Sequence, residues 1–294
     1  YKKLKQKTLS LDNDGVMDAD AFDKYNKEFI SYINDDMNTS SSLTVLYDVL
    51  KDDSLNDTTK KALVESFDKV LSLDLLKQEE IDINKLPRKK TYEWFRKFDY
   101  STYGVTVKVD ITKLVKHCKE NKESFFIDML YIIVNALNSV KELRMRLYNG
   151  KPVIYDDINP AVTVMTNNEV FENVRFKNYH NFKEFYKVAR TLIDEAKNEE
   201  KLNDNNYNPD KIMDEYYVTC LPWIDFTNVT HPYPSDIDNQ TIPRICWGKY
   251  TLNNDNYEMM LNISVSHIFV DGLHLSKVFD KVNELLDNTK EILK

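Results

Sequence analysis

The sequence predicts an α/β domain over residues 82–294, with a mixed sheet covered by helices, preceded by a small all-α helical bundle over residues 1–81. The first third of the chain has apolar positions at helical spacing and no convincing strand. Beyond it, short alternating segments are interleaved with helical ones. The stretch 77–87 is polar and ends in Pro87, which makes it the best candidate for a linker.

Composition places the chain among globular proteins. Its 294 residues are 42% hydrophobic and 30% charged, and the net charge is −8. This charge opposes non-specific binding to nucleic acid or to anionic membranes, which attract clustered Lys and Arg. With no apolar run of membrane-spanning length and no signal peptide, we expect a cytoplasmic protein without a membrane partner. Tyr1 is not an initiator methionine, which fits a chain cut from a longer one.

The cysteines argue against a structural metal. Cys118, Cys220 and Cys246 are odd in number and are not spaced as ligand pairs. We interpret them as reduced thiols, forming neither a disulfide framework nor a zinc site, and we expect no metal.

The helical bundle is predicted from three amphipathic segments. These cover residues 21–33, 40–50 and 58–71, with Thr58 or Thr59 as the candidate N-cap of the third.

In the α/β part, alternation over residues 103–109 predicts a strand that ends at Asp110. Asp110 can cap a helix over 111–121, and Ser124 can cap an apolar helix over 125–140. Asn149-Gly150 predicts a hairpin over 144–155 with a type I′ turn. The other predicted elements are strands at 162–165, 170–176, 216–220, 244–251 and 258–267, and helices at 182–197 and 273–286.

One motif carries chemistry. His267 and Asp271-Gly272 form H-x-x-x-D-G, and the predicted strand places His267 at its C-terminal end. Acyl transfer from a thioester to an alcohol needs a base with a pKa near neutrality, which an imidazole supplies. Asp271 lies beyond the turn, where we expect it to pair with a cation and fix the loop rather than orient the imidazole. The other histidines are expected to be satisfied core residues: His117, His180, His231 and His274.

Residues 94–286 resemble chloramphenicol acetyltransferase over nearly their whole length. The resemblance rests on ordered motifs that include H-x-x-x-D-G. The others are Val109-Asp110-Ile111-Thr112, the runs 142–146 and 149–156, Leu221-Pro222-Trp223 and Gly248-Lys249-Tyr250.

The resemblance implies a homotrimer with active sites between subunits. It implies His267 as the general base, an Asp271–Arg88 ion pair that positions the histidine loop, and Thr219 as the hydroxyl that hydrogen-bonds the oxyanion. The co-substrate would be acetyl-CoA, with Lys249 and Tyr250 along its channel. Trp94, Phe95 and Phe171 would line the acceptor pocket, although these rings could equally be core and Lys249 a solvated charge.

The chain also departs from the family pattern. Ser266 replaces the first of two consecutive histidines, and Phe95 replaces a tyrosine. Tyr217 stands where an asparagine is common, and Cys246 replaces a threonine or serine that helps to hold a water near the oxyanion. The catalytic residues therefore look intact, whereas the acceptor pocket is altered.

Residues 1–75 resemble the helical domain of cysteinyl-tRNA synthetase that contacts the anticodon stem, through the motif Ile33-Asn34-Asp35-Asp36-Met37-Asn38-Thr39. The chain would then be the C-terminal part of a synthetase–acetyltransferase fusion, or would retain a helical domain for packing. Acidic residues outnumber basic ones in residues 1–81, which weakens the expectation of tRNA contact by this part alone.

The sequence thus predicts an acetyl-CoA-dependent O-acetyltransferase acting on a small hydroxyl acceptor, chloramphenicol or similar. An acyltransferase with another donor or acceptor is a second hypothesis, because dihydrolipoyl acyltransferase cores share H-x-x-x-D-G. A third is a catalytically silent module of a synthetase that serves trimerisation or tRNA binding.

Overall fold

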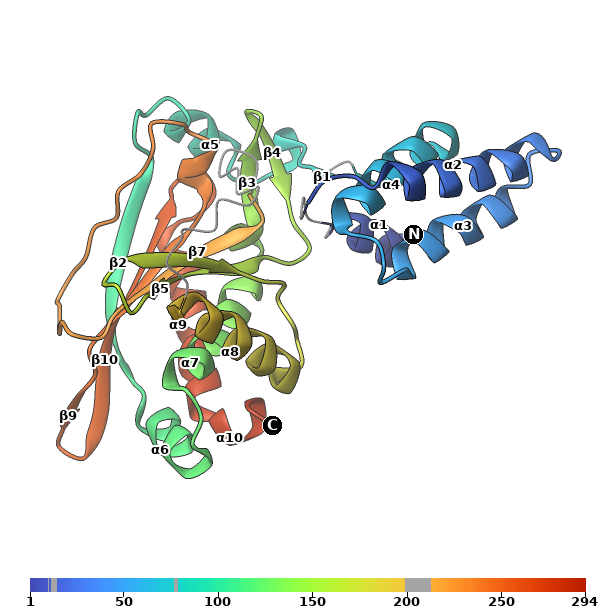
Figure 1. The fold of residues 1–294 in the computed structure, drawn as a ribbon. Helices are drawn as coiled ribbons and strands as arrows, with labels where there is room; N and C mark the ends of the chain where they lie inside the picture. The colour runs from blue at the N-terminus through green and yellow to red at the C-terminus, as the bar shows by residue number, and fades with distance from the viewer. Residues whose placement is uncertain (10, 12–14, 77–78, 199–212) are drawn as a thin grey trace. The chain divides into compact units, whose positions relative to one another are not determined.

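The chain has two hydrophobic cores, and each belongs to a compact unit of its own (Figure 1). The computed structural model describes residues 1–9, 11, 15–76, 79–198 and 213–294. The units divide after residue 78, three residues before the boundary that the sequence predicts. Within the described residues, no helix is long and apolar enough to span a membrane.

The N-terminal unit is a helical bundle. Its helices are α1 (Lys2–Leu9), α2 (Ala19–Asn34), α3 (Thr39–Lys51) and α4 (Asp57–Leu71). The last three are those that the sequence predicts, but α1 was not expected because its sequence is mostly polar. At the start of α4 the predicted cap is wrong. Asn56 caps the helix and accepts the backbone N–H of Thr59, because its carboxamide reaches the first turn while Thr59 lies inside it.

The motif at residues 33–39 forms the turn between α2 and α3. Asp36 and Met37 both have positive φ, at 49° and 53°, and Asn38 accepts the N–H of Ser41 as the N-cap of α3. The carboxamide of Asn38 thus begins α3 directly after the reversal of the chain.

The core of the helical unit centres on a pair of stacked rings. Phe29 and Phe67 are fully buried, with ring centroids 4.1 Å apart. We expect Phe67→Ala to lower the free energy of unfolding of this unit by about 3–5 kcal/mol. Because the two cores share no residue, calorimetry should show an earlier transition for this unit and an unchanged one for the α/β unit. A common downward shift of both transitions would contradict this prediction.

The α/β unit is built on a seven-stranded mixed sheet. The strand order is β2-β10-β8-β7-β5-β6, with β9 paired to β10. β7 runs parallel to β5 and to β8, and the other neighbours are antiparallel. The strands are β2 (Thr102–Asp110), β5 (Asn159–Met165), β6 (Phe171–Arg175), β7 (Glu215–Leu221), β8 (Arg244–Gly248), β9 (Thr251–Asn253) and β10 (Asn256–Ser266). This is the mixed α/β architecture that the sequence predicts.

The two faces of this sheet differ. One carries the buried apolar residues and faces the helices, which gather on that side in Figure 1. The other carries polar residues such as Thr106, Thr163, Thr219 and Asn262. The helices are α5 (Lys89–Phe95), α6 (Thr112–Asn121), α7 (Phe125–Asn138), α8 (Phe182–Asn198), α9 (Gly272–Asp287) and α10 (Thr289–Ile292), with 3₁₀ turns η1 (Ile83–Lys85), η2 (Lys141–Arg144) and η3 (Asn239–Thr241).

A smaller sheet holds the predicted hairpin. β3 (Met145–Tyr148) and β4 (Lys151–Ile154) are joined by Asn149 and Gly150, whose φ values of 51° and 71° are those of a type I′ turn. β1 (Glu79–Glu80) pairs with β4. The expected linker at 77–87 is therefore partly ordered, with β1 and η1 inside it, because its backbone finds a partner that is distant in sequence. Residues 77–78 lie outside the described part.

Three local expectations in this unit are wrong. The predicted strand at 244–251 is broken at residues 249–250, because the N–H of Lys249 bonds to the carbonyl of Ile224 instead of to a strand. Ser124 makes no side-chain cap on α7. Asp110 bonds the N–H of Thr112, but Ile111 occupies the N-cap position of α6.

Candidate active site

His267 lies directly after β10, at the end of the longest strand of the sheet. Its backbone N–H donates to the carbonyl of Ser101 at 2.7 Å, which extends the pairing of β10 with β2 by one step. The adjacent Ser266 is buried, and its hydroxyl lies 2.7 Å from that of Ser101. The histidine is therefore held at the end of a rigid strand rather than on a free loop.

An ion pair fixes the turn that follows. The two terminal nitrogens of the Arg88 guanidinium, Nη1 and Nη2, each donate to one oxygen of Asp271 at 2.9 Å. One of them, Nη2, also donates to the backbone carbonyl of His267 at 3.0 Å. The predicted pair is thus present, and Arg88 ties Asp271, the N-cap of the last long helix, to the histidine itself.

Asp271 does not orient the imidazole through a hydrogen bond. Its Oδ1 lies 3.0 Å from Nδ1 of His267, but this nitrogen has no partner of hydrogen-bond geometry in the described chain. Asp271 instead caps α9, where His274 completes a capping box by accepting the N–H of Asp271 on its Nδ1. The carboxylate therefore caps α9 and pairs with Arg88.

Two aromatic rings pack against the imidazole. Phe95 stacks on it with centroids 4.1 Å apart and planes 6° from parallel, and Tyr103 lies 4.7 Å away. Burial, with a smaller effect from the charge of Asp271, raises the pKa of Tyr103 to about 12, so this ring stays neutral. Trp94 packs 5.5 Å from Phe95 and is 61% exposed, so it faces solvent in the single chain.

A second group of predicted residues lies on the polar face of the sheet. Thr219 on β7 has its hydroxyl 2.7 Å from that of Thr163 on β5. Cys246 is the register partner of Thr219 on β8 and is fully buried, and burial raises the pKa of its thiol to about 12. Phe171 on β6 is 54% exposed. It lies near this row of residues, because Asn173, two positions further along β6, pairs with Thr163.

Within one chain, the residues around His267 and the residues around Thr219 lie far apart. Asn262 pairs with Cys246, which pairs with Thr219, so Thr219 lies two strands, or about 10 Å, from β10. His267 is a further five residues along β10, or about 16 Å. Within a single chain His267 and Thr219 are therefore roughly 19 Å apart, too far to act on one substrate.

Lys249 and Tyr250 lie away from His267. They follow β8, near the opposite end of β10, where the ring of Tyr250 contacts those of Phe125 and Tyr257. Lys249 is exposed, and Tyr250 is 37% exposed. Two adjacent residues thus offer a cation and a ring at the end of the sheet away from His267.

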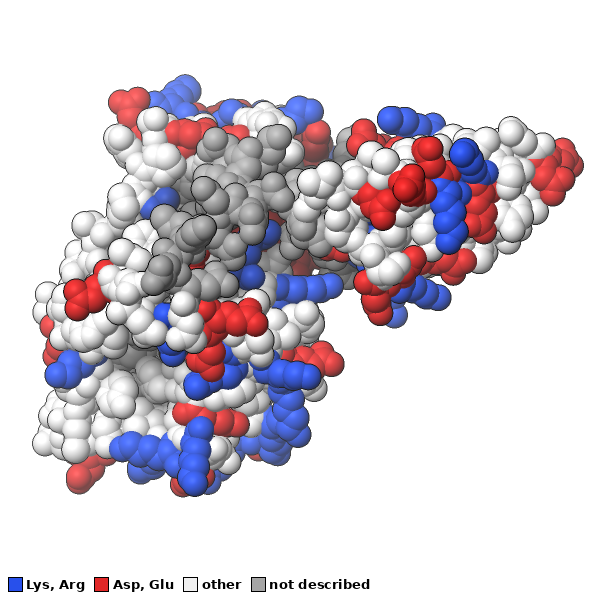
Figure 2. All heavy atoms as spheres, in the orientation of Figure 1, with Lys and Arg blue, Asp and Glu red and all other residues white. Residues whose placement is uncertain are grey.

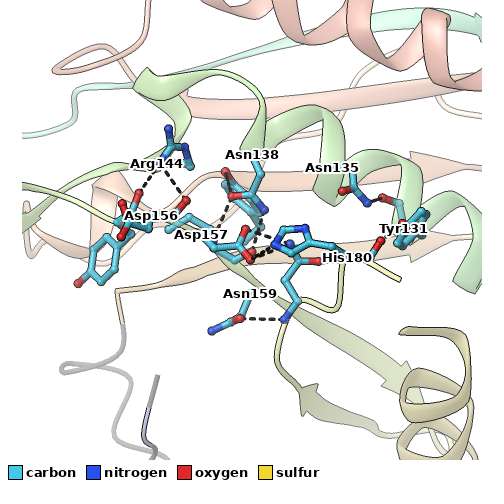
Figure 3. Close-up of polar contacts among 12 residues, drawn as sticks. Tyr131, Asn135, Asn138, Arg144, Asp156, Asp157, Asn159 and His180 are labelled. Atoms are coloured by element: carbon cyan, nitrogen blue, oxygen red, sulfur yellow. Dashed lines mark hydrogen bonds and ion pairs between the residues drawn. The ribbon is translucent and has the colours of Figure 1, made fainter. Parts of the chain in front are cut away.

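A separate polar cluster involves His180 and joins the entry of β5 to α7 and α8 (Figure 3). Both oxygens of Asp157 accept the side-chain amide of Asn178, and Nε2 of His180 lies 3.2 Å away. Burial raises the pKa of Asp157. His180 is 70% exposed, so the expectation that it is a core residue is wrong, because it reaches this pair from the surface.

The remaining histidines have partners close by. His231 contacts Asn262 at 3.3 Å, and burial lowers its pKa. Nε2 of His117 lies 3.0 Å from Glu123. Sequence reasoning missed Tyr103 and Ser101 as neighbours of His267. The pairing of β2 with β10 places both there, and residue spacing alone does not reveal it.

The mixed sheet and its helices match a solved chloramphenicol acetyltransferase at 27% identity, which places the protein in the class of acyltransferases. The family model for chloramphenicol acetyltransferase matches residues 76–285. The chain belongs to the chloramphenicol acetyltransferase family.

Individual relatives support this assignment. Chloramphenicol acetyltransferase from Proteus mirabilis is 29% identical over 209 residues, which cover 70% of this chain and 94% of the relative. The enzyme of the same name from Clostridium perfringens is 27% identical over 210 residues, which cover 71% of this chain and 94% of the relative. A solved structure of a chloramphenicol acetyltransferase aligns with a TM-score of 0.66 at 27% identity, covering 71% of this chain and 99% of that one.

More distant structures share the fold alone. A dihydrolipoamide acetyltransferase from Azotobacter vinelandii aligns with a TM-score of 0.53 at 13% identity, covering 70% of this chain and 88% of that one. Almost all of the helical unit lies outside the region that the family model matches.

Proposed function

We propose that the protein transfers the acetyl group of acetyl-CoA to a hydroxyl of a small acceptor, with His267 as general base. The observation that carries the proposal is the immobilised imidazole. It is stacked on Phe95 and tied through its backbone to Arg88. No hydrogen bond from the described residues engages Nε2, so this nitrogen is available to take the proton of an acceptor.

The reaction then balances as a simple acyl transfer. The acceptor oxygen attacks the thioester carbonyl carbon while its proton moves to Nε2 of His267. The tetrahedral oxyanion collapses, the carbon–sulfur bond breaks, and the departing thiolate takes the proton back. The products are an acetyl ester and free coenzyme A, with the imidazole regenerated.

Thr219 is the proposed donor to the oxyanion, and it would come from a neighbouring subunit. The estimated 19 Å between His267 and Thr219 in one chain leaves each half of the site incomplete. We therefore propose a homotrimer in which His267, Phe95 and Trp94 of one copy face Thr219 and Phe171 of the next. Lys249 and Tyr250 would hold the coenzyme, the cation at phosphate and the ring at adenine.

The acceptor is proposed to be chloramphenicol or a similar alcohol, in line with the names of the relatives. Phe95 has no hydroxyl to offer an acceptor, so its pocket side is apolar. The direct test is release of free thiol from acetyl-CoA with and without chloramphenicol. Release that depends on the antibiotic supports this acceptor, whereas coenzyme binding without release would replace chloramphenicol with another alcohol.

Replacing Thr219 with valine keeps the shape of the side chain and removes its hydroxyl. We expect kcat to fall about 10²–10³-fold with little change in coenzyme affinity, because the lost hydrogen bond forms only in the transition state. Thr191→Val, on the exposed face of α8, is the control and should leave kcat unchanged. A fall in affinity with unchanged kcat would contradict a role at the oxyanion.

The same variant tests the shared site. Inactive His267→Ala chains and Thr219→Val chains, mixed under conditions that exchange subunits, should regain activity. Some interfaces then combine an intact His267 with an intact Thr219 from the next copy. No recovery, despite mixed oligomers detected by mass, would place both residues in the site of one chain.

For the helical unit we retain, as a proposal, its relation to the anticodon-stem domain of cysteinyl-tRNA synthetase and to a fusion with that enzyme. Figure 2 shows acidic side chains spread over the visible face of this unit, with basic ones between them. Such a face favours a packing role over tRNA contact. A gel shift with tRNA on the full chain tests the point, since a shift below about 1 µM would support contact.

A further inference from the structure

A cluster of ligand-type side chains lies away from the candidate active site, where α6 turns into α7. It contains His117 from the last turn of α6, Glu123 from the connecting loop and Asp128 from the first turn of α7. Each offers a donor atom, and these atoms lie within 4.8 Å of one another. The three residues span only twelve positions of the chain, so a single helix–turn–helix builds the cluster.

The local backbone explains why these side chains converge. Lys122 adopts the left-handed conformation with φ 57° and ends α6. The N–H of Glu123 then donates to the carbonyl of Cys118 at 3.0 Å, which folds the loop back over the last turn of the helix. This places Oε2 of Glu123 3.0 Å from Nε2 of His117.

Asp128 supplies an independent indication of a ligand. Its side chain is fully buried, and its Oδ2 accepts the thiol of Cys118 at 3.1 Å. Its Oδ1 is also buried and has no hydrogen-bond partner. An unpaired carboxylate oxygen in an apolar interior is costly, and buried acids therefore ordinarily have hydrogen-bond partners. Oδ1 of Asp128 lacks one among the described residues.

The charges of the cluster favour a cation. Two carboxylates face one imidazole and one thiol. Among the residues that the structure describes, no lysine or arginine lies within ion-pair distance of Glu123 or Asp128.

We propose that His117, Glu123 and Asp128 bind a zinc ion, through Nε2, a Glu123 carboxylate oxygen and Oδ1. Imidazole and carboxylate donors suit Zn²⁺, and three protein ligands leave a fourth position for water. Around a tetrahedral zinc ion with bonds of about 2.0–2.2 Å, the donor atoms lie about 3.4 Å apart. The pair of His117 and Glu123, now 3.0 Å apart, would open slightly, and any wider pair within the 4.8 Å limit would close. Cys118 orients the carboxylate by occupying its other oxygen.

Asn121 contacts the histidine and would have to move when a metal binds. Its side-chain nitrogen lies 3.3 Å from Nδ1 of His117. The same nitrogen donates to the backbone carbonyl of His117 at 3.0 Å, so Nδ1 faces a donor and the ring proton lies on Nε2, toward Glu123. Zinc at Nε2 would displace that proton and would require the amide of Asn121 to move away from Nδ1. The expectation that the chain lacks a metal site considered cysteine spacing and did not cover this donor set.

Equilibrium dialysis of the chelator-treated full chain against ZnSO₄, followed by elemental analysis, tests the proposal. We expect one zinc per chain and a rise in the thermal midpoint of the α/β unit. Glu123→Gln preserves shape at a position whose side chain is 26% exposed, and it should weaken binding at least about tenfold. Asp128→Asn should weaken it at least as much.

The matched control is His180→Ala, which removes a histidine from another His–carboxylate pair, one whose acid is already bonded by Asn178. It should leave zinc binding unchanged. Stoichiometry well below one, equal binding by parent and Glu123→Gln, or loss of binding in His180→Ala would each overturn the proposal. Zinc content does not depend on acetyl transfer, so this test is separate from that of the proposed function.

Discussion

Replacing His267 with alanine is expected to lower the rate of acetyl transfer about 10²–10⁴-fold, the usual contribution of a general base. The loss should fall on kcat, because the imidazole acts on the acceptor proton rather than on coenzyme binding. His267→Gln should lose a similar factor, since an amide has the size of the ring but no basicity. Thiol release measured with a colour reagent gives both values.

The control separates chemistry from folding. The His267 side chain is one third exposed, so its truncation should move the thermal midpoint by only a few degrees. His231→Ala removes a different, half-buried histidine and should keep near-normal turnover. A His267→Ala enzyme within threefold of the parent rate, with coenzyme bound normally, would refute His267 as the base.

Much of the fold is predictable from local pattern, and the errors share one cause. The hairpin turn follows from Asn149-Gly150, since both residues tolerate positive φ. The break between β8 and β9 was not predicted, because it depends on the carbonyl of Ile224, 25 positions before Lys249. The pairing of β1 with β4 likewise joins segments more than 70 residues apart. Such contacts leave no trace in residue spacing.

The candidate site likewise contains residues that local spacing predicts and residues that only distant contacts identify. The H-x-x-x-D-G spacing singles out His267 and Asp271, because a strand end and a turn put them together. Nothing local selects Arg88, 183 positions from Asp271, from among 40 lysines and arginines. Only the resemblance to a family supplied it. The distance between His267 and Thr219 needed the sheet register, which the sequence does not contain.

Replacing Arg88 with methionine is expected to impair both stability and turnover. The guanidinium is only 12% exposed and makes three charge-assisted bonds, whereas Asp271 is 38% exposed and can regain some water. We therefore expect a loss of about 1–3 kcal/mol in the free energy of unfolding of the α/β unit, below the range for a fully buried pair. Denaturant titration of this unit measures it.

Turnover should fall about 10–10²-fold, because the carbonyl of His267 loses its anchor and the imidazole its fixed position. Lys89→Met is the matched control. The ammonium group of Lys89 is exposed, donates to Asn84 at 2.8 Å and lies 3.7 Å from Glu93. Because exposed polar contacts of this kind contribute little, the substitution should change neither stability nor turnover.

A double-mutant cycle distinguishes positioning from simple stabilisation. Asp271→Asn alone leaves Arg88 partly unpaired, and Arg88→Met alone leaves Asp271 without its cation. If the two side chains act as one clamp, the free energy of unfolding lost by the double variant should be smaller than the sum of the losses of the two single variants, by about 0.5–3 kcal/mol. Additive losses would mean that Arg88 and Asp271 do not act as a pair. An Arg88→Met enzyme that is destabilised but keeps its full kcat when folded would mean that the pair serves the fold and that His267 holds its position without it.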